Sequence, residues 1–429
     1  MTRIRATAKA TFRSLHVRNY RLYFCAQLVS VSGTWMQTVA QAFLVLHLAS
    51  PARAGLSLGL VTALQFLPML LFGTWGGLVA DRFNKRRLLY GTQSAAGILA
   101  LTLGLLTASG AVRLWQVFVL ATLLGFVNMI DNPARQTFVL ELVGRDDLPN
   151  AVSLNSVVMN SARVIGPAIG GALIAFVGLA TCFEVNAASY LAVIIGLWRM
   201  TGADLHPSTV VARGKGQLRQ GLRYVWRTPG LRQPLLLVAV VGTLAYNFQV
   251  VLALFARFTF HGGAGVYSAL TSLMGGGAVL GGLVVATRIR PNLHRLTTVG
   301  TVFGVFIGAV ALAPSLPAAL VLMVPMGAFS IAFIATANAT LQLRAEPSMR
   351  GRVMSLYAIA FLGTTPIGSP LVGWISQAAS PRVALAVGAS ATVVASLVTR
   401  HFHRREHLSV SAAAPVLEES EPGTELGVA

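Results

Sequence analysis

The chain has 429 residues, of which 55% are hydrophobic and only 11% are charged, and its mean hydropathy is +0.69. Because soluble domains carry about 25% charged residues, too few polar side chains are present to cover a water-exposed surface. This composition excludes an ordinary soluble protein and predicts that lipid is the solvent for much of the surface. The formal net charge of +20 would also suit a nucleic-acid partner, so the positions of the charges must decide.

Apolar runs of the length needed to cross a bilayer, about 20 residues, recur along the whole sequence. We expect twelve transmembrane helices, at about 22–47, 55–80, 88–109, 114–133, 152–177, 181–199, 233–257, 265–287, 296–313, 317–340, 353–378 and 383–399.

The basic residues divide unevenly between the two sides that these spans define. With the N-terminus inside, the cytoplasmic segments hold 28 of the 33 Lys and Arg residues, and the outer loops hold Arg53, Arg113, Arg257 and Arg382. Cytoplasmic loops of membrane proteins are enriched in Lys and Arg, so both termini are expected in the cytoplasm. The positive charge then faces anionic lipid headgroups, and we expect no nucleic-acid partner.

Two stretches of sequence recur at similar offsets. Residues 76–79 (Gly-Gly-Leu-Val) return 205 positions later as 281–284, and residues 166–171 parallel 369–374 at an offset of 203. We therefore predict an all-α membrane protein of two pseudo-symmetric six-helix bundles, at 22–199 and 233–400.

The remaining segments are predicted to be cytoplasmic. Residues 1–21 have the pattern of an amphipathic N-terminal segment, and 200–232 form a central loop with a short amphipathic helix over about 217–226. Residues 401–429 are rich in Glu, Ala and Pro towards their end, so we expect a disordered tail.

A charged loop follows the second predicted span. Its distinctive residues are Gly77, Asp81, Arg82, Lys85, Arg86 and Arg87. The simplest interpretation is that the basic residues anchor the loop on the cytoplasmic side. That interpretation leaves the acidic residue at the end of an apolar helix unexplained.

The loop resembles the signature between helices 2 and 3 of the major facilitator superfamily. Gly166, Pro167, Gly170 and Gly171 in the fifth span resemble the motif of its drug:proton antiporters. Residues 131–136 (Asp-Asn-Pro-Ala-Arg-Gln) resemble the branch of enterobactin and multidrug exporters. The resemblance covers about residues 12–400 and implies the superfamily's twelve-helix fold, with a substrate exported in exchange for protons.

The resemblance also implies that Asp81 faces the N-terminus of the eleventh span, in the other half. A helix N-terminus favours an anion by about 0.3–1 kcal/mol, so this contact would latch the halves together on the cytoplasmic side. Asp131 ends the fourth span at a similar depth, and we expect Lys85 or Arg86 to pair with it. Asn84 stands where the superfamily usually has Gly, and Asn tolerates a positive φ better than most residues.

Charged and polar residues within the spans mark a candidate cavity. Arg163 lies near mid-bilayer, where a charge is costly unless it faces a polar cavity, a partner or an anionic substrate. Glu184 is the best remaining carboxylate for binding a proton, unless it is simply an acid exposed at the outer mouth, and Asp131 is the competing proton site. The further cavity candidates are Gln37, Gln41, Tyr246 and Asn247.

We therefore expect a monomeric secondary active transporter in a bacterial inner membrane. It is expected to export a small, mostly apolar molecule, with protons as the coupling ion. The alternatives are an importer or lipid flippase of the same fold, and a non-transporting membrane sensor or assembly partner. The sequence has no Walker loop, HExxH motif or Gly-x-Ser-x-Gly elbow. We therefore expect that the protein is not an enzyme, has no catalytic residue and binds no metal or cofactor.

Overall fold

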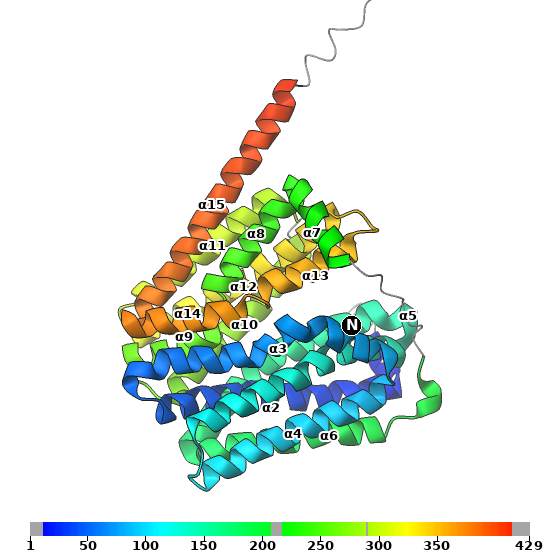
Figure 1. The fold of residues 1–429 in the computed structure, drawn as a ribbon, viewed down its shortest axis with the longest axis vertical. Helices are drawn as coiled ribbons and strands as arrows, with labels where there is room; N and C mark the ends of the chain where they lie inside the picture. The colour runs from blue at the N-terminus through cyan, green and yellow to red at the C-terminus, as the bar shows by residue number, and fades with distance from the viewer. Residues whose placement is uncertain (1–11, 207–216, 289–290, 414–429) are drawn as a thin grey trace, which may run out of the picture.

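The computed structural model describes residues 12–206, 217–288 and 291–413, and within these ranges it is helical with no β-strand (Figure 1). The helices of the first half are η1 (Arg13–His16), α2 (Arg18–Leu48), η2 (Pro51–Arg53), α3 (Ala54–Arg82), α4 (Lys85–Ala108), α5 (Leu114–Phe176), α6 (Leu179–Trp198) and η3 (Gly202–Asp204). Those that follow are α7 (Gln217–Arg227), α8 (Pro229–Leu244), α9 (Phe248–Leu254), η4 (Phe255–Thr259), α10 (Ala264–Arg288), α11 (Leu293–Leu312), α12 (Leu316–Arg344), α13 (Arg350–Phe361), α14 (Thr365–Ala378) and α15 (Pro381–Ala413).

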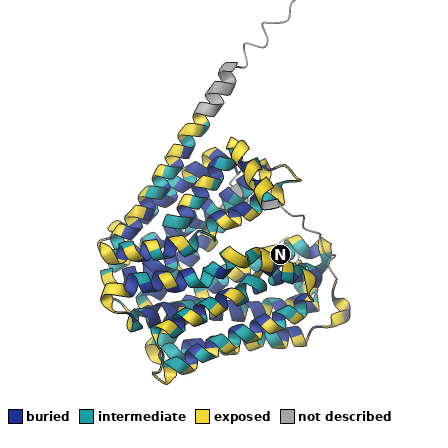
Figure 2. Ribbon diagram, in the orientation of Figure 1, coloured by how far each residue is buried: buried dark blue, intermediate teal, exposed yellow. Residues whose placement is uncertain are grey.

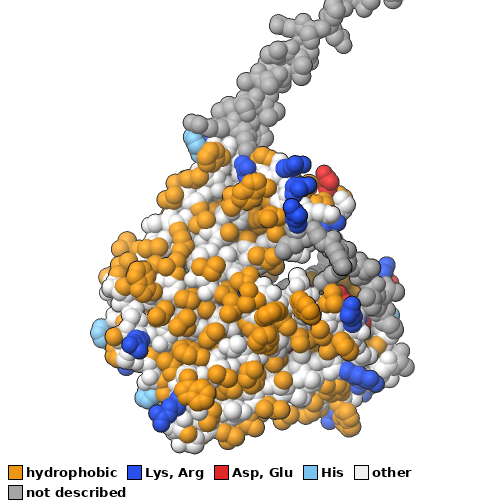
Figure 3. Space-filling model, in the orientation of Figure 1, with side chains coloured by type: hydrophobic (Ala, Val, Ile, Leu, Met, Phe, Trp, Pro, Cys, Tyr) orange, Lys and Arg blue, Asp and Glu red, His pale blue; other side chains and the backbone are white. Residues whose placement is uncertain are grey.

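The surface of these helices is apolar over most of its area. Figure 2 shows buried and exposed residues alternating along the helices, and Figure 3 shows hydrophobic side chains across the flank of the molecule. Phe176 and Leu312 are 87% and 80% exposed, which would be costly in water but is favourable in lipid. Ten helical stretches of the described chain are long and apolar enough to cross a membrane, some of them composed of consecutive helices, such as α8 to η4 and α13 to α14, so the predicted fold class is confirmed.

The predicted number of twelve spans requires two further helices. The 63-residue α5 contains two helical segments that meet at Gly144, where φ is 72° and ψ is −174°, a backbone conformation that essentially only glycine adopts. Helix α2 is 31 residues long but is not among the ten apolar spans, because polar residues such as Gln27, Ser30 and Gln37 interrupt it and are buried inside the protein. The count of twelve stays a prediction.

Two spans predicted as continuous, 233–257 and 353–378, are broken in the structure. The first is divided between α8 and α9 at residues 245–247, and the second between α13 and α14 at 362–364. At the first break, Nδ2 of Asn247 donates to the carbonyl of Thr243 at 2.7 Å, and such local side-chain bonds compete with the helical backbone pattern.

The repeat in the sequence corresponds to a repeated packing contact. A Cβ atom on Gly76 of α3 would lie 2.2 Å from the carbonyl oxygen of Met129 in α5. A Cβ atom on Gly281 of α10 would lie 2.4 Å from the carbonyl oxygen of Ala328 in α12. Both glycines therefore let two helix backbones touch, as small residues commonly do in membranes, and the two halves use the same crossing.

The flanking segments differ in part from the prediction. The predicted amphipathic helix of the central loop is present as α7, whereas residues 207–216 lie outside the described residues. Helix α15 continues to Ala413, so the prediction of disorder is wrong for residues 401–413, which contain no Gly or Pro to end the helix. The predicted N-terminal segment is described only from residue 12 and the tail only to 413; the rest lies outside the described residues.

The crossing of α10 and α12 can be tested with neighbouring glycines. A Cβ atom at Gly277 would lie 1.9 Å from the carbonyl oxygen of Val324, whereas one at Gly276 would meet nothing within 4 Å. We expect Gly277→Ala to destabilise the purified protein by about 1–3 kcal/mol, the usual range for overpacking. Gly276→Ala is the matched control and should not lower the unfolding temperature. Equal unfolding temperatures for the two variants would contradict the close crossing.

Candidate functional site

The two halves touch most closely at one end of the molecule, through α3 and α14. A Cβ atom at Gly55 would lie 2.2 Å from the carbonyl oxygen of Gly373, and a Cβ atom at Gly373 would lie 2.2 Å from the carbonyl oxygen of Gly55. One turn further on, Gly59 lies against the backbone of Ser369. In the predicted orientation this is the outer end, so the glycines close the protein on the side away from the cytoplasm.

A second pair of helices, α5 and α10, joins the halves on the other side of their interface. Ser272 Oγ donates to the carbonyl of Val164 at 3.0 Å. Nearer the outer end, a Cβ atom on Gly171 would lie 2.6 Å from Ser268 Oγ. The antiporter-like motif therefore contributes directly to the contact between halves, through its last glycine.

The remaining residues of that motif pack α5 onto α2. A Cβ atom at Gly166 would lie 2.5 Å from the carbonyl oxygen of Ser32, and one at Gly170 would lie 3.2 Å from that of Met36. Pro167 is buried within α5 beside them and also lines a cavity.

Two cavities adjoin one another: a polar one lined by the first half together with Gln249, and a mainly apolar one lined by both halves. The polar chamber has a volume of about 370 Å³, and the apolar chamber about 360 Å³. The residues common to both are Trp35, Thr38, Phe66, Met159 and Gln249. Because the chambers share walls, they form one candidate site for a small molecule of appreciable size.

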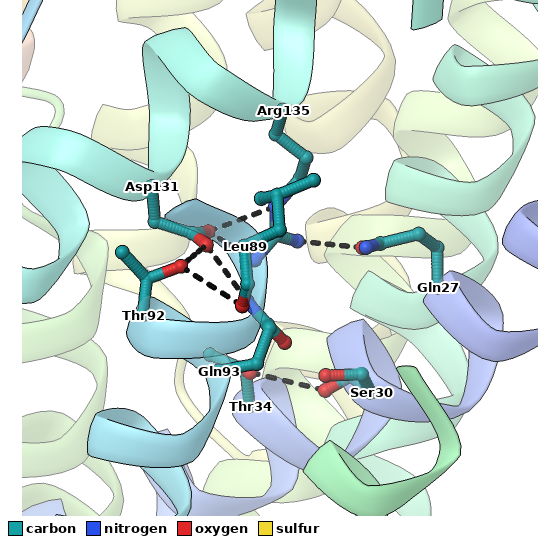
Figure 4. A network of polar contacts seen from close by, with 8 residues as sticks. All are labelled: Gln27, Ser30, Thr34, Leu89, Thr92, Gln93, Asp131 and Arg135. Carbon is teal, nitrogen blue, oxygen red and sulfur yellow. Dashed lines mark hydrogen bonds and ion pairs between the residues drawn. The ribbon is translucent and has the colours of Figure 1, made fainter. Parts of the chain in front are cut away.

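The polar chamber is built around Asp131, which is only 1% exposed. Its Oδ1 accepts hydrogen bonds from Thr92 Oγ1 at 2.6 Å and from Gln93 Nε2 at 2.8 Å (Figure 4). Its Oδ2 accepts one from Nε of Arg135 at 2.9 Å and forms an ion pair with Nη2 of the same side chain. Nη1 of Arg135 donates to Gln27 Oε1 at 2.6 Å, so the network joins α2, α4 and α5.

The expected pairing of Asp131 with Lys85 or Arg86 is therefore wrong. Lys85 Nζ instead lies 3.3 Å from Glu141 Oε1, with both side chains buried. Arg86 Nη2 donates to the carbonyls of residues 197, 198 and 200, at the C-terminus of α6. A helix C-terminus attracts a cation, which accounts for the position of Arg86. Lys85 and Arg86 therefore both bind partners within the first half other than Asp131.

The rest of the charged loop lies at the end of α3. Asn84 does not adopt the positive φ expected of it: its φ is −62°, and its side chain caps α4 by accepting from the backbone N–H of Arg87 at 3.1 Å. Gly77 is buried, Asp81 is half-buried, and Arg82 and Arg87 are exposed. Helix α3 packs extensively on α14 rather than on α13, where the eleventh span begins, so the latch remains a prediction.

Arg163 lies in the wall of the apolar chamber, as its position in the sequence suggested. Its guanidinium carbon lies 5.2 Å from the ring centroid of Trp35, a cation–π contact. Among the described residues, Nε of Arg163 has no hydrogen-bond partner. Tyr246 and Asn247, at the break between α8 and α9, line the same chamber, so three of the predicted cavity residues come together.

The other predicted cavity residues do not join them. The side chain of Gln37 is buried and accepts from Nδ2 of Asn186 at 2.5 Å. Gln41 lines neither chamber but a hollow of only about 20 Å³, which shares Thr38 and Gln249 with both of them. Glu184 packs against Gly104 of α4 and lies in neither chamber, which leaves Asp131 as the predicted carboxylate that borders the cavity.

Arg135 is the functional candidate that the sequence interpretation missed. It was assigned to a cytoplasmic loop over 134–150, but α5 continues through this region and Arg135 borders the polar chamber. The i, i+4 spacing of Asp131 and Arg135 places them on one helical face, and that signal was available in the sequence. Gln27 and Gln93 had no such signal, because their role depends on the packing of three helices.

Comparison with known proteins identifies the family. Residues 9–426 match the sequence family described as transmembrane secretion effectors of the major facilitator superfamily. The chain belongs to this family. It is therefore a multi-pass membrane transporter, and the predicted superfamily is confirmed.

Several bacterial transporters have similar sequences. The multidrug efflux pump Tap of Mycolicibacterium fortuitum is 29% identical over 368 residues, covering 83% of this chain and 89% of its own. The enterobactin exporter EntS of Citrobacter koseri is 24% identical, covering 88% and 90%. The staphyloferrin A transporter of Staphylococcus aureus is 29% identical over a shorter match, 41% and 44%.

Solved structures with the same fold include transporters of different substrates. A bacterial homologue of the lysosomal transporter Spinster, in an inward-facing and unoccupied conformation, has a TM-score of 0.66 at 19% identity, covering 90% of this chain and 94% of its own. The nucleoside transporter NupG has a TM-score of 0.71 at 12% identity, covering 89% and 98%. At such identities these structures support the fold alone.

The Asp131–Arg135 pair can be tested through protein stability. Asp131→Asn leaves the partly buried guanidinium of Arg135 without its counter-ion; breaking a fully buried pair on one side costs about 3–5 kcal/mol, and we expect a smaller loss here because Arg135 borders a cavity. We expect the unfolding temperature to fall for this variant and to recover largely in Asp131→Asn/Arg135→Gln. Asp146→Asn, at an exposed position of the same helix, is the control. A double variant no more stable than Asp131→Asn would contradict the pairing.

Proposed function

We propose that the protein exports a small, mostly apolar molecule carrying an anionic group across the bacterial inner membrane, by proton-coupled alternating access. The exporters among its relatives support the direction of transport. The observation that carries the proposal is the joined cavity between the halves. It lies beside Arg163 and is closed at its outer end by the contacts of Gly55 with Gly373 and of Gly171 with Ser268.

Broken helices beside the cavity support this proposal further. Transporters of several folds bind substrates near the membrane midplane at discontinuous helices, where irregular backbone is sheltered by protein. Here the breaks flank the apolar chamber: Asn247 and Phe361 both line it. Ser369 Oγ donates to Asn247 Oδ1 at 2.8 Å, so the first break is hydrogen-bonded to α14, beside the contact of Gly59 with Ser369.

We infer that Arg163 receives the anionic group of the substrate. Its guanidinium is held by the face of Trp35 and borders aromatic residues, which exclude water and strengthen an ionic contact. A substrate with an acidic group on an apolar body would satisfy both the arginine and the aromatic wall.

We infer that Asp131 is the group that exchanges its proton. Of the two carboxylates considered, it borders the cavity, and its charge is balanced by Arg135. Protonation of Asp131 would release Arg135 from the ion pair. The freed guanidinium could then pair with an acidic substrate, which would link proton binding to substrate movement.

A screen of efflux substrates provides the direct test of function. Expression in a bacterial host lacking its own pumps should reduce the accumulation of some acidic amphipathic drugs or siderophores. Inverted membrane vesicles should take up the same compounds when a proton gradient is imposed. Uptake by intact cells would favour an importer, and no substrate-dependent proton movement in proteoliposomes would favour a non-transporting protein.

The role of Arg163 predicts a selective loss of transport. Arg163→Gln removes the charge while keeping a polar side chain, and we expect transport of an anionic substrate to fall at least about tenfold, the cost of one charge-assisted hydrogen bond. The protein should still reach the membrane in normal amounts. Arg257→Gln, at a predicted outer loop, serves as the control. Normal export of the substrate by Arg163→Gln would contradict this role.

The role of Asp131 predicts uncoupling rather than inactivity. In proteoliposomes, Asp131→Asn/Arg135→Gln should still exchange labelled for unlabelled substrate but should no longer accumulate it in response to a pH gradient. Glu184→Gln should behave like the unaltered protein in both assays. Proton-driven accumulation by the double variant would show that the coupling site lies elsewhere.

The proposed latch predicts a shift between conformations. Asp81→Asn should lose the attraction of Asp81 for the N-terminus of α13, which is about 0.3–1 kcal/mol for an exposed contact, and should favour the inward-open state. A cysteine at Thr38, which lines both chambers, should then react less with an impermeant thiol reagent added outside. Asp81→Glu is the control, since it keeps the charge. Equal reactivity in both variants would count against the latch.

A further inference from the structure

Helix α7 presents two contrasting faces. On its inner face Val225 is 1% exposed, and Tyr224 Oη accepts from the backbone N–H of Glu346 at 3.3 Å. On the same side Gly221 lies close to Arg352 of α13, where a Cβ atom would be 3.0 Å from its Cβ. Helix α7 is therefore fixed against the second half, at the turn that leads into α13.

The outer face of α7 combines arginines with large apolar side chains. Its members are Arg219, Leu222, Arg223, Trp226 and Arg227, all of them exposed, and we name this group the arginine face. Spacings of three and four residues bring these side chains together along one side of a helix. They border a shallow hollow of about 430 Å³, and Lys and Arg side chains gather at this end of the molecule in Figure 3.

The charges of this face have no counter-ion among the residues that the structure describes. Within the part of the chain that is described, none of the three arginines forms an ion pair, and α7 contains no acidic residue. Like charges four residues apart on a helix repel one another. Glu346, an acidic residue on the packed inner side, contacts Tyr224 through its backbone N–H, on the opposite face.

The apolar side chains of this face are not covered by the described part of the protein. Trp226 is 57% exposed and Leu222 is 48% exposed, between arginines that would otherwise favour water. A tryptophan with basic residues around it is the composition of a helix that lies at the membrane interface, with the ring at the level of the headgroups.

We propose that the arginine face is a binding site for one anionic phospholipid, whose phosphate is held by the arginines and whose acyl chains lie along Trp226 and Leu222. Arginine suits this role because its planar guanidinium donates two parallel hydrogen bonds to a phosphate. The site adds to the transport cavity and does not depend on the substrate or the coupling ion. A lipid held there anchors α7, and through Tyr224 the start of α13, to the membrane surface.

Native mass spectrometry of the purified full-length protein, titrated with phosphatidylglycerol, tests this site. Each arginine near an anionic lipid contributes roughly fivefold to binding, so Arg219→Gln/Arg223→Gln/Arg227→Gln should bind about 100-fold more weakly. Trp226→Ala should also weaken binding. Replacement of the same three arginines by lysine should preserve much of it, which separates loss of the site from loss of folding.

A second triple variant controls for net charge. Arg21, Arg199 and Arg404 are also exposed and predicted to be cytoplasmic, and their replacement by Gln should leave the strongest phosphatidylglycerol binding unchanged. Phosphatidylcholine and inorganic phosphate should not compete. Unchanged lipid binding in the arginine-face variant, an equal loss in the control triple, or displacement by inorganic phosphate would each overturn the proposal.

Discussion

The arrangement of the whole protein depends on the close approach of helix backbones at glycines. Within each half, Gly76 and Gly281 allow equivalent crossings, and between the halves Gly55 and Gly373 bring α3 and α14 into direct contact. Membrane helices gain no hydrophobic free energy from meeting one another, because lipid is as apolar as their side chains. Packing at short range must therefore hold the halves together, and contacts of this kind can be made or lost as units.

The interior combines this close packing with a small number of buried charges. Asp131 and Arg135 neutralise each other inside the first half, whereas Arg163 faces the chamber with Trp35 beside it. The halves are alike in their crossings but differ in chemistry: the paired charges belong to the first half, and the breaks at α8–α9 and α13–α14 belong to the second. The proposed mechanism assigns proton exchange to the first and much of the apolar wall to the second.

Local sequence patterns were enough to predict most of the fold. Hydropathy located the helices, because each span must satisfy its own backbone in lipid, and the repeat predicted two similar halves, although it did not predict their equivalent crossings at Gly76 and Gly281. The breaks at Asn247 and near Gly363 were not predicted, since hydropathy is insensitive to a few irregular residues. Disorder was wrongly predicted for residues 401–413 because the amino-acid composition was considered over 401–429 as a whole. That range combines the end of α15 with the acidic segment that follows it.

The candidate site was predicted less completely than the fold. Arg163 was recognised because an isolated charge in an apolar span is costly wherever it lies. The partners of Lys85 and Asp131 were wrongly assigned, because several acids and bases lie at similar depth and only tertiary packing decides which of them meet. Arg135 was missed because the end of a span was placed too early, which turned a cavity residue into a loop residue.

In the proposed alternating access, the two halves separate at their outer end when they close at the cytoplasmic end. Spin labels on Arg53 and Ser380 would report the outer separation, and labels on Arg82 and Gly351 the inner one, by pulsed electron paramagnetic resonance. With substrate and changing pH, the account predicts that the outer distance increases as the inner distance decreases. Transport that proceeds while both distances stay fixed, or change in the same direction, would contradict it.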